Sequence, residues 1–425
     1  MKFLEDYRII DLGQVIAGTI GGLILADFGA DVIKVESPSG DIGRNPNIAG
    51  VGDVSGIFLT FNRGKKGLVI DLKSDEGKKV FLDLVTVSDA VIANFRPGTL
   101  DRLGIGFEEM KKYNSNIIFV DSSGYGEEGP WRDKPAFDVV EQAMSGHMAI
   151  TGEPGGPPLR NGSPTADIST ALYTAIACMA GLLGKQKGKG AKHFEVPMFD
   201  VQLSMLGYIS TMYLNNGDIP QPPGSAHEYM VPYQAFPTAT IYIVLSPREE
   251  RFYKKMCEVM EIPEYATDPR FVTNDLRVKN KDELLPKLEE ILLQKPGEEW
   301  CKLFEDAGVP AAPVNTLDRA LDNEQVEKRS LIKNFKYPGS GDVRVVGNPI
   351  MDIGSEKSSI CDPAPMHGEH TIQILRETLG YEKEKIDSLL EKNVIQTEKK
   401  IKLTEDFNLQ VLQLIFHQRV LFHFD

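Results

Sequence analysis

Short apolar runs alternate with longer helix-like stretches over the first two hundred residues of the chain. The runs "RIIDLG" (8–13), "DVIKVE" (31–36), "GLVIDL" (67–72), "AVIANF" (90–95) and "IIFVDSSGYG" (117–126) predict strands. A small-residue helix is expected between the first two strands, and a charged helix over 73–84. This alternation predicts an α/β fold in which helices flank a parallel sheet.

The pattern changes after residue 200. Residues 201–224 are predicted to be a linker, because the stretch that starts at "NNGDIPQPPG" is rich in Pro and Gly. A strand pair in "AFPTATIYIVLS" (235–246) is followed by amphipathic helices within 248–260 and 281–294. A smaller α+β domain is therefore expected over 225–315. The tail 396–425 contains the apolar stretch "FNLQVLQLIFHQRVLFHFD", which suits a helix packed on its own protein or on a partner, or one lying on a membrane surface.

Composition narrows the functional class. The net charge of −14 disfavours a general nucleic-acid binder, because phosphate binding needs a basic face. The four cysteines (178, 257, 301 and 361) are far apart and form no CxxC pair, which indicates reduced thiols and no metal site. The acidic N-terminus does not look like a signal peptide, so we expect a cytoplasmic protein.

A single carboxylate opens a long uncharged segment. Asp167 precedes seventeen uncharged residues, 168–184, which are slightly too few for a membrane span and indicate a helix buried in protein. An Asp here can simply cap the helix. The same N–H groups and helix dipole also stabilise the ionised carboxylate, which is the form that acts as a covalent catalyst.

A series of motifs identifies a family. In chain order they are "GADVIKVESPSGD" (29–41), "VIANFRPGTLDRLGIGFEEM" (91–110) and "GSPTADIST" (162–170), followed near the end by "MHGEHTIQILRETLGYEKEKIDSLLEKNVI". Together they resemble the class III CoA-transferases, whose superfamily includes formyl-CoA and carnitine CoA-transferases and alpha-methylacyl-CoA racemases. The resemblance implies a Rossmann-like large CoA-binding domain, here 1–200 completed by 330–395, and an interlocked-ring homodimer.

The resemblance also implies catalytic roles. The transferase nucleophile matches Asp167, which would pass through aspartyl-acyl anhydride and aspartyl-CoA thioester intermediates. The racemases use a His in a triplet that corresponds here to 136–138 and contains no imidazole, so transferase is favoured over racemase or epimerase. A non-catalytic CoA-binding protein of the same fold stays as a third alternative.

Further positions follow from the same resemblance. The turn residues Gln14, Val15, Ile16 and Ala17 match the segment that contacts the thioester and its oxyanion. CoA contacts are expected at Val15, Asn94, Phe95, Arg102, Lys134 and Phe137. Acyl-CoA and a carboxylic acid are the implied substrates, with no tightly bound cofactor; no nucleic-acid or membrane partner is expected.

Overall fold

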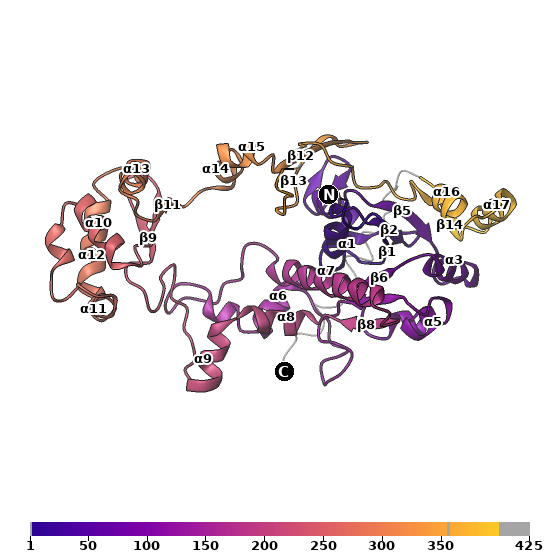
Figure 1. The fold of residues 1–425 in the computed structure, drawn as a ribbon, viewed down its shortest axis with the longest axis horizontal. Helices are drawn as coiled ribbons and strands as arrows, with labels where there is room; N and C mark the ends of the chain where they lie inside the picture. Colours follow the sequence, from indigo (N-terminus) through magenta and orange to yellow (C-terminus); the bar gives the residue numbers. More distant parts are fainter. Residues whose placement is uncertain (1, 355–357, 399–425) are drawn as a thin grey trace, which may run out of the picture. The chain divides into compact units, whose positions relative to one another are not determined.

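The computed structural model describes residues 2–354 and 358–398, which form two compact units (Figure 1). Of the described residues, the large unit consists of 2–137, 166–201, 331–354 and 358–398. The small unit consists of 138–165 and 202–330, so a segment from within the predicted domain 1–200 packs with the small unit. Most of the predicted tail, 396–425, lies outside the described residues.

A seven-stranded sheet forms the centre of the large unit. Its order is β14-β5-β2-β1-β6-β7-β8, and every neighbouring pair is parallel except β14 with β5. The strands are β1 (Arg8–Asp11), β2 (Asp31–Glu36), β5 (Lys66–Ile70), β6 (Ala90–Ala93), β7 (Ile118–Asp121), β8 (Lys192–Glu195) and β14 (Ile395–Gln396). The predicted α/β fold with a parallel sheet is confirmed.

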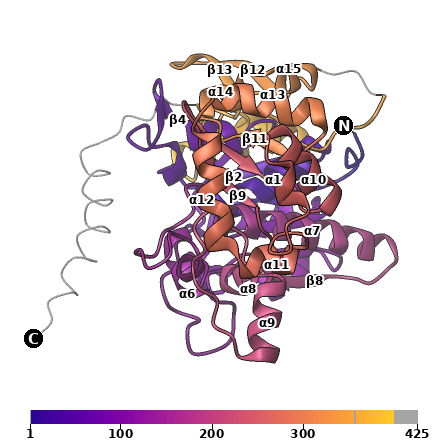
Figure 2. The same cartoon turned by 90° about the vertical axis from the view of Figure 1, so that its left-hand side faces the viewer.

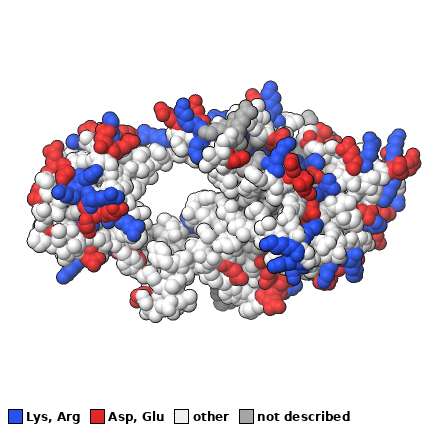
Figure 3. All heavy atoms as spheres, in the orientation of Figure 1, with Lys and Arg blue, Asp and Glu red and all other residues white. Residues whose placement is uncertain are grey.

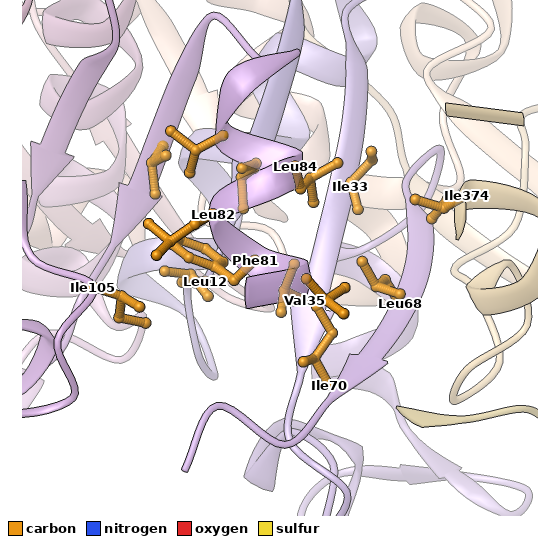
Figure 4. Packing of buried hydrophobic residues seen from close by; sticks show 14 of the residues in the cluster. Leu12, Ile33, Val35, Leu68, Ile70, Phe81, Leu82, Leu84, Ile105 and Ile374 are labelled. Carbon is orange, nitrogen blue, oxygen red and sulfur yellow. The ribbon is translucent and has the colours of Figure 1, made fainter. Parts of the chain in front are cut away.

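Helices cover both faces of this sheet, which is why its strands are almost continuously apolar. Successive residues point to opposite faces: Ile10 belongs to one buried cluster and Ile9 to the other. The first cluster includes side chains of α3 (Asp75–Thr86), α5 (Phe107–Tyr113) and α17 (Lys383–Glu391). Figure 4 shows Phe81 and Leu84 of α3 in this cluster together with Ile33 of β2. The second cluster includes side chains of α1 (Ala17–Asp27) and α7 (Thr165–Gln186).

Helix α7 is the segment that the uncharged run predicted. Its length and composition alone would suffice to cross a membrane, but half of its apolar stretch is buried inside the protein. Gly181 brings the helix close to the sheet, since a Cβ there would lie 2.5 Å from Cγ2 of Ile118 and 3.1 Å from the Phe194 ring. Gly184, one turn further, has nothing closer than the Lys189 side chain at 3.6 Å.

The small unit is built on a three-stranded antiparallel sheet, β11-β10-β9. Its strands are β9 (Gln234–Pro237), β10 (Tyr242–Leu245) and β11 (Ala311–Pro313), and its main helices are α10 (Glu250–Val259), α12 (Lys281–Leu292) and α13 (Gly297–Ala307). Figure 2 shows these helices around the sheet, where their apolar faces form one core. The predicted strand pair and both predicted helices are confirmed.

The predicted linker 201–224 is largely helical. It contains the end of α8 (Met198–Met205) and all of α9 (Tyr208–Asn216), so the prediction of an irregular connector there was wrong. Apart from Gly207, which precedes α9, the Pro and Gly residues of this range lie in 217–224. Helix α9 ends just before Gly217, whose φ of 77° is left-handed.

Shorter elements complete the chain. They are β3 (Gly50–Val51), β4 (Val54–Ser55), α2 (Gly56–Phe61), α4 (Thr99–Arg102), α6 (Asp138–Met144), α11 (Asn274–Lys279), α14 (Leu317–Leu321), α15 (Glu324–Lys328), β12 (Ile332–Tyr337), β13 (Gly341–Val346) and α16 (Thr371–Gln373). The β12–β13 hairpin packs on α2 and forms a separate small core.

Two glycine substitutions in α7 test its packing. Ala is a better helix former than Gly by about 1 kcal/mol, so Gly184→Ala should raise the free energy of unfolding by up to that amount. Gly181→Ala should lower it by about 1–3 kcal/mol, because the new methyl group overlaps Ile118. Urea unfolding followed by circular dichroism measures both, and the same sign for the two variants would contradict the packing described.

Candidate active site

The site is built around the turn that follows β1, at the point where the strand order reverses between β1 and β6. Ligands of open α/β sheets bind outside the carboxyl ends of the strands at such a point. Val15 in this turn has φ of 59°, which is uncommon for a β-branched residue and persists only where the surroundings fix it. The Val15 N–H donates to Oδ1 of Asp41 (3.2 Å), and its carbonyl accepts from the Thr19 hydroxyl (2.8 Å).

Buried ion pairs lie beneath this turn. Nζ of Lys34 lies 2.7 Å from Oδ2 of Asp41 and also donates to the Gly13 carbonyl. Nζ of Lys65 lies 2.7 Å from Oδ2 of Asp11, whose Oδ1 accepts from the Gly13 N–H. Their side chains are at most 1% exposed, so the turn is held between two internal charge pairs.

The pKa of each lysine reflects this burial. Burial alone would lower the pKa of Lys34, but Asp41, Asp11 and Glu36 outweigh it and raise the pKa above the usual range. Burial lowers the pKa of Lys65 to about 8, despite the opposing effect of Asp11. Lys34 therefore stays charged to higher pH than Lys65.

A third buried pair anchors the segment after β2. Burial of Glu36 would raise its pKa, but Arg44 outweighs this and lowers it to about 2. Arg44 donates to both Glu36 oxygens (2.8 and 2.7 Å) and to the Pro365 carbonyl, and its guanidinium lies 3.6 Å from the centre of the Phe58 ring. The C-terminal part of the large unit is thereby tied to the segment that carries Asp41.

Asp167 lies in the first turn of α7, close to this N-terminal turn. Its neighbour Ala166 is fully buried and packs with Ala17, the first residue of α1, and with Met198. One turn further along α1, the Gly21 position approaches Thr174 of α7. The two helices therefore run in the same direction, and both N-terminal ends, with their partial positive charge, lie on the side of Asp167.

The structure divides the four predicted thioester-contacting residues into two pairs. Gln14 donates its N–H to Oδ1 of Asn94 (2.8 Å), and Val15 donates to Asp41, so neither N–H is available to a ligand. Within the described part of the chain, the N–H groups of Ile16 and Ala17 have no acceptor. Of the four predicted residues, Ile16 and Ala17 are thus the two whose backbone N–H groups have no acceptor within the described residues.

The predicted CoA contacts fall into three places. Asn94 is locked to Gln14 through both ends of its amide, and Phe95 packs against the main core. Gly98, with φ of 71°, caps α4, and a Cβ there would lie 3.3 Å from Nη1 of Arg102 and 3.2 Å from Nη2 of Arg132. These two guanidinium groups from distant segments therefore flank one patch of backbone.

The remaining two predicted contacts lie at the surface. The Lys134 ammonium lies 4.8 Å from the centre of the Trp131 ring, two residues from Arg132. Phe137 is 57% exposed at the end of a large-unit segment. The structure thus places Lys134 against Trp131, and Phe137 is not among the described residues of the two clusters that flank the large sheet.

Sequence reasoning missed the charged residues that hold the turn. Asp11, Lys34 and Glu36 sit inside apolar strands, and that interruption was a visible signal in "RIIDLG" and "DVIKVE". No group of three or more metal-ligating side chains occurs in the ranges that the structure describes. Cys178 and Cys257 are buried free thiols, and burial raises the pKa of Cys178 to about 12.

Comparison with known proteins places the chain among CoA-transferases. The profile of CoA-transferase family III matches residues 4–371. The chain is 36% identical over 397 residues to the human succinyl-CoA:glutarate CoA-transferase, covering 93% of this chain and 90% of that protein. It is also 36% identical over 376 residues to the acetyl-CoA:oxalate CoA-transferase of Acetobacter aceti, covering 88% and 95%. The crystal structure of a CaiB/BaiF family protein from Brucella suis superposes with a TM-score of 0.79 at 31% identity, covering 89% and 99%.

Removing Lys34 tests the buried pair. Lys34→Met should lower the free energy of unfolding by about 3–5 kcal/mol, because it leaves the Asp41 carboxylate buried without its cation. Lys66→Met is the matched control: Lys66 pairs with Asp31 at the surface, so its loss should change the free energy by less than about 1 kcal/mol. Urea unfolding measures both, and equal effects would show that the Lys34 pair does not hold this region.

Proposed function

The chain belongs to CoA-transferase family III, and from that premise we propose that it moves CoA from an acyl-CoA donor to an acceptor carboxylic acid with Asp167 as the covalent carrier. The observation that carries the proposal is the packing of Ala166 on Ala17. It brings the start of α7, with its carboxylate, to the start of α1, where the N–H groups of Ile16 and Ala17 have no acceptor among the described residues. A nucleophile and oxyanion donors are thereby on adjacent helix ends.

The proposed reaction has four steps. A carboxylate oxygen of Asp167 attacks the donor thioester carbonyl, the C–S bond breaks, and an aspartyl-acyl anhydride and CoA thiolate form. The thiolate attacks the aspartyl carbonyl of the anhydride, which gives an aspartyl-CoA thioester and releases the donor acid. The acceptor carboxylate then attacks this thioester and expels the thiolate. Finally the thiolate attacks the acceptor's acyl carbon, giving the new thioester and the free Asp167 carboxylate.

Each step passes through a tetrahedral oxyanion. The N–H groups of Ile16 and Ala17, at the positive end of α1, are the donors that we assign to it. The strained Val15 and its contacts to Asp41 and Thr19 fix the direction of these donors before substrate arrives. Such preorganised donors stabilise charge without reorganising during the reaction.

Three basic side chains of the large unit suit the phosphates of CoA. We assign phosphate contacts to Arg102 and Lys134, together with Arg132. A single guanidinium group can donate to two phosphate oxygens at once, and a lysine ammonium binds phosphate as a point charge. Val15, Asn94 and Phe95 are assigned to the part of CoA that approaches the thioester, and Phe137 to its periphery. Arg132 is new to this set and rests on its position beside Gly98.

A short dicarboxylate is the acceptor class that we propose. The support is the names of the relatives, whose substrates are succinyl-CoA with glutarate and acetyl-CoA with oxalate. A screen of glutarate, succinate, oxalate and matched monocarboxylates against succinyl-CoA and acetyl-CoA, read by mass spectrometry, tests it. Faster turnover of the monocarboxylates would reject the dicarboxylate class.

Replacing Asp167 tests the mechanism. Asp167→Ala and Asp167→Asn should each lower kcat by about 10⁴-fold or more while leaving CoA binding unchanged, because only the nucleophile is lost. Hydroxylamine added with an acyl-CoA donor should convert Asp167 of the native protein to a hydroxamate, detected by peptide mass spectrometry. Asp342→Asn, an exposed carboxylate on β13, should behave as the native protein.

Other outcomes separate the alternatives. Normal turnover in Asp167→Ala would exclude this carboxylate as the carrier. Exchange of the α-proton of a 2-methylacyl-CoA in deuterated water, without any acceptor acid, would indicate a racemase instead. If neither hydroxylamine trapping nor α-proton exchange is observed, the remaining alternative is a CoA-binding protein without catalytic activity.

We also propose that the chain works as a homodimer. Helix α9 exposes Tyr208, Tyr213 and Leu214 by 61, 50 and 77%, and its surface is largely uncharged in Figure 3. Within the large unit, α7 exposes Ile176 and Leu183 by 56 and 59%. Exposed apolar surfaces of this kind mark protein contacts.

Sedimentation equilibrium tests the assembly. The native protein should have twice the mass of the 47.1-kDa chain, and Leu214→Glu combined with Tyr213→Glu should shift it toward the single-chain mass. Two charges introduced at an apolar contact oppose association because they must be desolvated. A single-chain mass for the native protein at all concentrations would refute the dimer.

A further inference from the structure

One buried lysine contacts both ends of the turn that carries the proposed oxyanion donors. Lys65 directly precedes β5, and its side chain is fully buried. Its Nζ donates to Oδ2 of Asp11 (2.7 Å), to the Thr19 carbonyl (2.7 Å) and to Oδ1 of Asn62 (3.0 Å). A lysine ammonium has three N–H donors, so every donor of this group is used.

Two of these acceptors lie on opposite sides of the turn. Asp11 ends β1, and its other carboxylate oxygen accepts from the Gly13 N–H (2.7 Å). Thr19 lies in the first turn of α1, and its hydroxyl donates to the carbonyls of Val15 and Ile16 (2.8 and 3.0 Å). The ammonium therefore sets the spacing between the end of the strand and the start of the helix, and the proposed oxyanion donors lie between the two.

The third acceptor holds the ammonium from its own side of the chain. Asn62 directly follows α2 and is fully buried, and its Nδ2 donates to the Phe58 carbonyl (3.3 Å). The backbone N–H of Lys65 also donates to the Asn62 carbonyl (3.4 Å). The lysine therefore reaches the turn from a fixed position.

The two ammonium groups that contact this turn differ in how firmly they hold their protons. Burial lowers the pKa of Lys65 to about 8; Asp11 opposes this effect and the charge of Lys34 adds to it. Burial acts on Lys34 in the same way, but Asp41, Asp11 and Glu36 outweigh it and raise its pKa. Of the two, Lys65 is therefore the one that loses its proton first as the pH rises above neutral.

We propose that Lys65 is a positioning residue for CoA transfer, and that the turn is set for catalysis only while the ammonium keeps all three contacts. The inference rests on the proposed function, because it concerns the donors assigned to the oxyanion. A neutral amine has two N–H groups for three acceptors, so one buried acceptor loses its hydrogen bond. The amine also no longer attracts the Asp11 carboxylate. The spacing between β1 and α1 is then no longer fixed, and the N–H groups of Ile16 and Ala17 lose their direction.

The other titratable groups on the surrounding elements change little between pH 7.5 and 9. Carboxylates and imidazoles ordinarily titrate below about pH 7, and guanidinium and ammonium groups above about pH 10. Burial raises the pKa of the Cys361 thiol, which moves its titration to higher pH. The segment of α2 (Gly56–Phe61) carries no titratable side chain. The groups concerned are Arg8, Asp11, Asp27, Asp31, Lys34, Glu36, Asp41, Arg63, Lys66, Cys361, Asp362, His367 and His370.

The pH dependence of transfer from succinyl-CoA to glutarate tests the proposal. In the native protein kcat should fall by about tenfold per pH unit above pH 8, as loss of one essential proton requires. KM for succinyl-CoA should stay constant, because the basic side chains assigned to the CoA phosphates are not affected. Lys66→Met is the control: it removes the next lysine in the chain, which pairs with Asp31 at the surface, and should leave the profile unchanged.

Asp11→Asn gives the sharper test, because it moves the Lys65 pKa in a known direction. The Asn side-chain oxygen still accepts from the Gly13 N–H, but the charge that raises the pKa of Lys65 is gone. The midpoint of the fall in kcat should therefore move down by about one pH unit or more. The variant should fold, since a buried lysine without a counter-ion can release its proton instead of staying charged.

Hydrogen exchange reads the same turn without any substrate. After correction for the intrinsic base-catalysed rate, the peptide 11–20 of the native protein should exchange about fivefold faster at pH 9 than at pH 7, as loss of one buried hydrogen bond implies. In Asp11→Asn the increase should begin at lower pH. The peptide 281–292, in α12 of the small unit, should show no such increase and serves as the internal control.

Two results would overturn the inference about Lys65. The first is an identical midpoint in the native protein and Asp11→Asn, which would assign the fall in kcat to another group, such as the thiol of CoA; a merely structural effect of the substitution would lower kcat equally at every pH. The second is equal corrected exchange of 11–20 at pH 7 and pH 9. Transfer activity without opening of the turn would reject this inference alone, whereas opening of the turn without any transfer activity would reject the proposed function.

Discussion

The attraction between the Lys34 ammonium and the Asp41 carboxylate, inside the protein and away from water, holds the turn on which the site depends. Asp41 reaches across to the backbone of Val15, and Lys34 reaches the Gly13 carbonyl, so one pair fixes both sides of the turn. Neither charge is stable there without the other, because desolvation of a single buried ion costs several kcal/mol. The second pair leaves no room for a larger residue at Gly22, because a Cβ there would overlap the Asp11 carboxylate that pairs with Lys65.

Helix ends add to this electrostatic frame. Helices α1 and α7 begin on the same side of the sheet, so partial positive charge from both accumulates near Asp167. The long apolar body of α7 serves this arrangement, because packing by Ala171, Thr174 and Cys178 fixes where its first turn lies. A polar helix would leave that end free to move. The uncharged run 168–184 therefore fixes the position of the Asp167 carboxylate that precedes it.

Local patterns predicted most of the fold, whereas contacts between distant segments were beyond them. Apolar runs located β1, β2, β5, β6 and β7, and the family motifs led to Asp167. The helix α9 was missed because the prolines and glycines after it dominated the composition of 201–224. The approach of Arg132 to Gly98 joins residues more than thirty positions apart, and no periodicity encodes it. Buried charges such as Lys34 were missed because a charged residue in a strand normally marks a solvent-facing position.

The last strand of the large sheet has a consequence for synthesis on the ribosome. β14 pairs with β5, and Ile374, Ile386 and Ile395 cover the apolar side of that region, yet some 325 residues separate Ile70 from Ile395. At about 5–20 residues per second, this part of the nascent chain stays uncovered for roughly 15–65 s. The N-terminal half therefore leaves the ribosome with an exposed apolar surface beside β5. Chaperones have this interval in which to cover that surface and keep it from neighbouring polysomes.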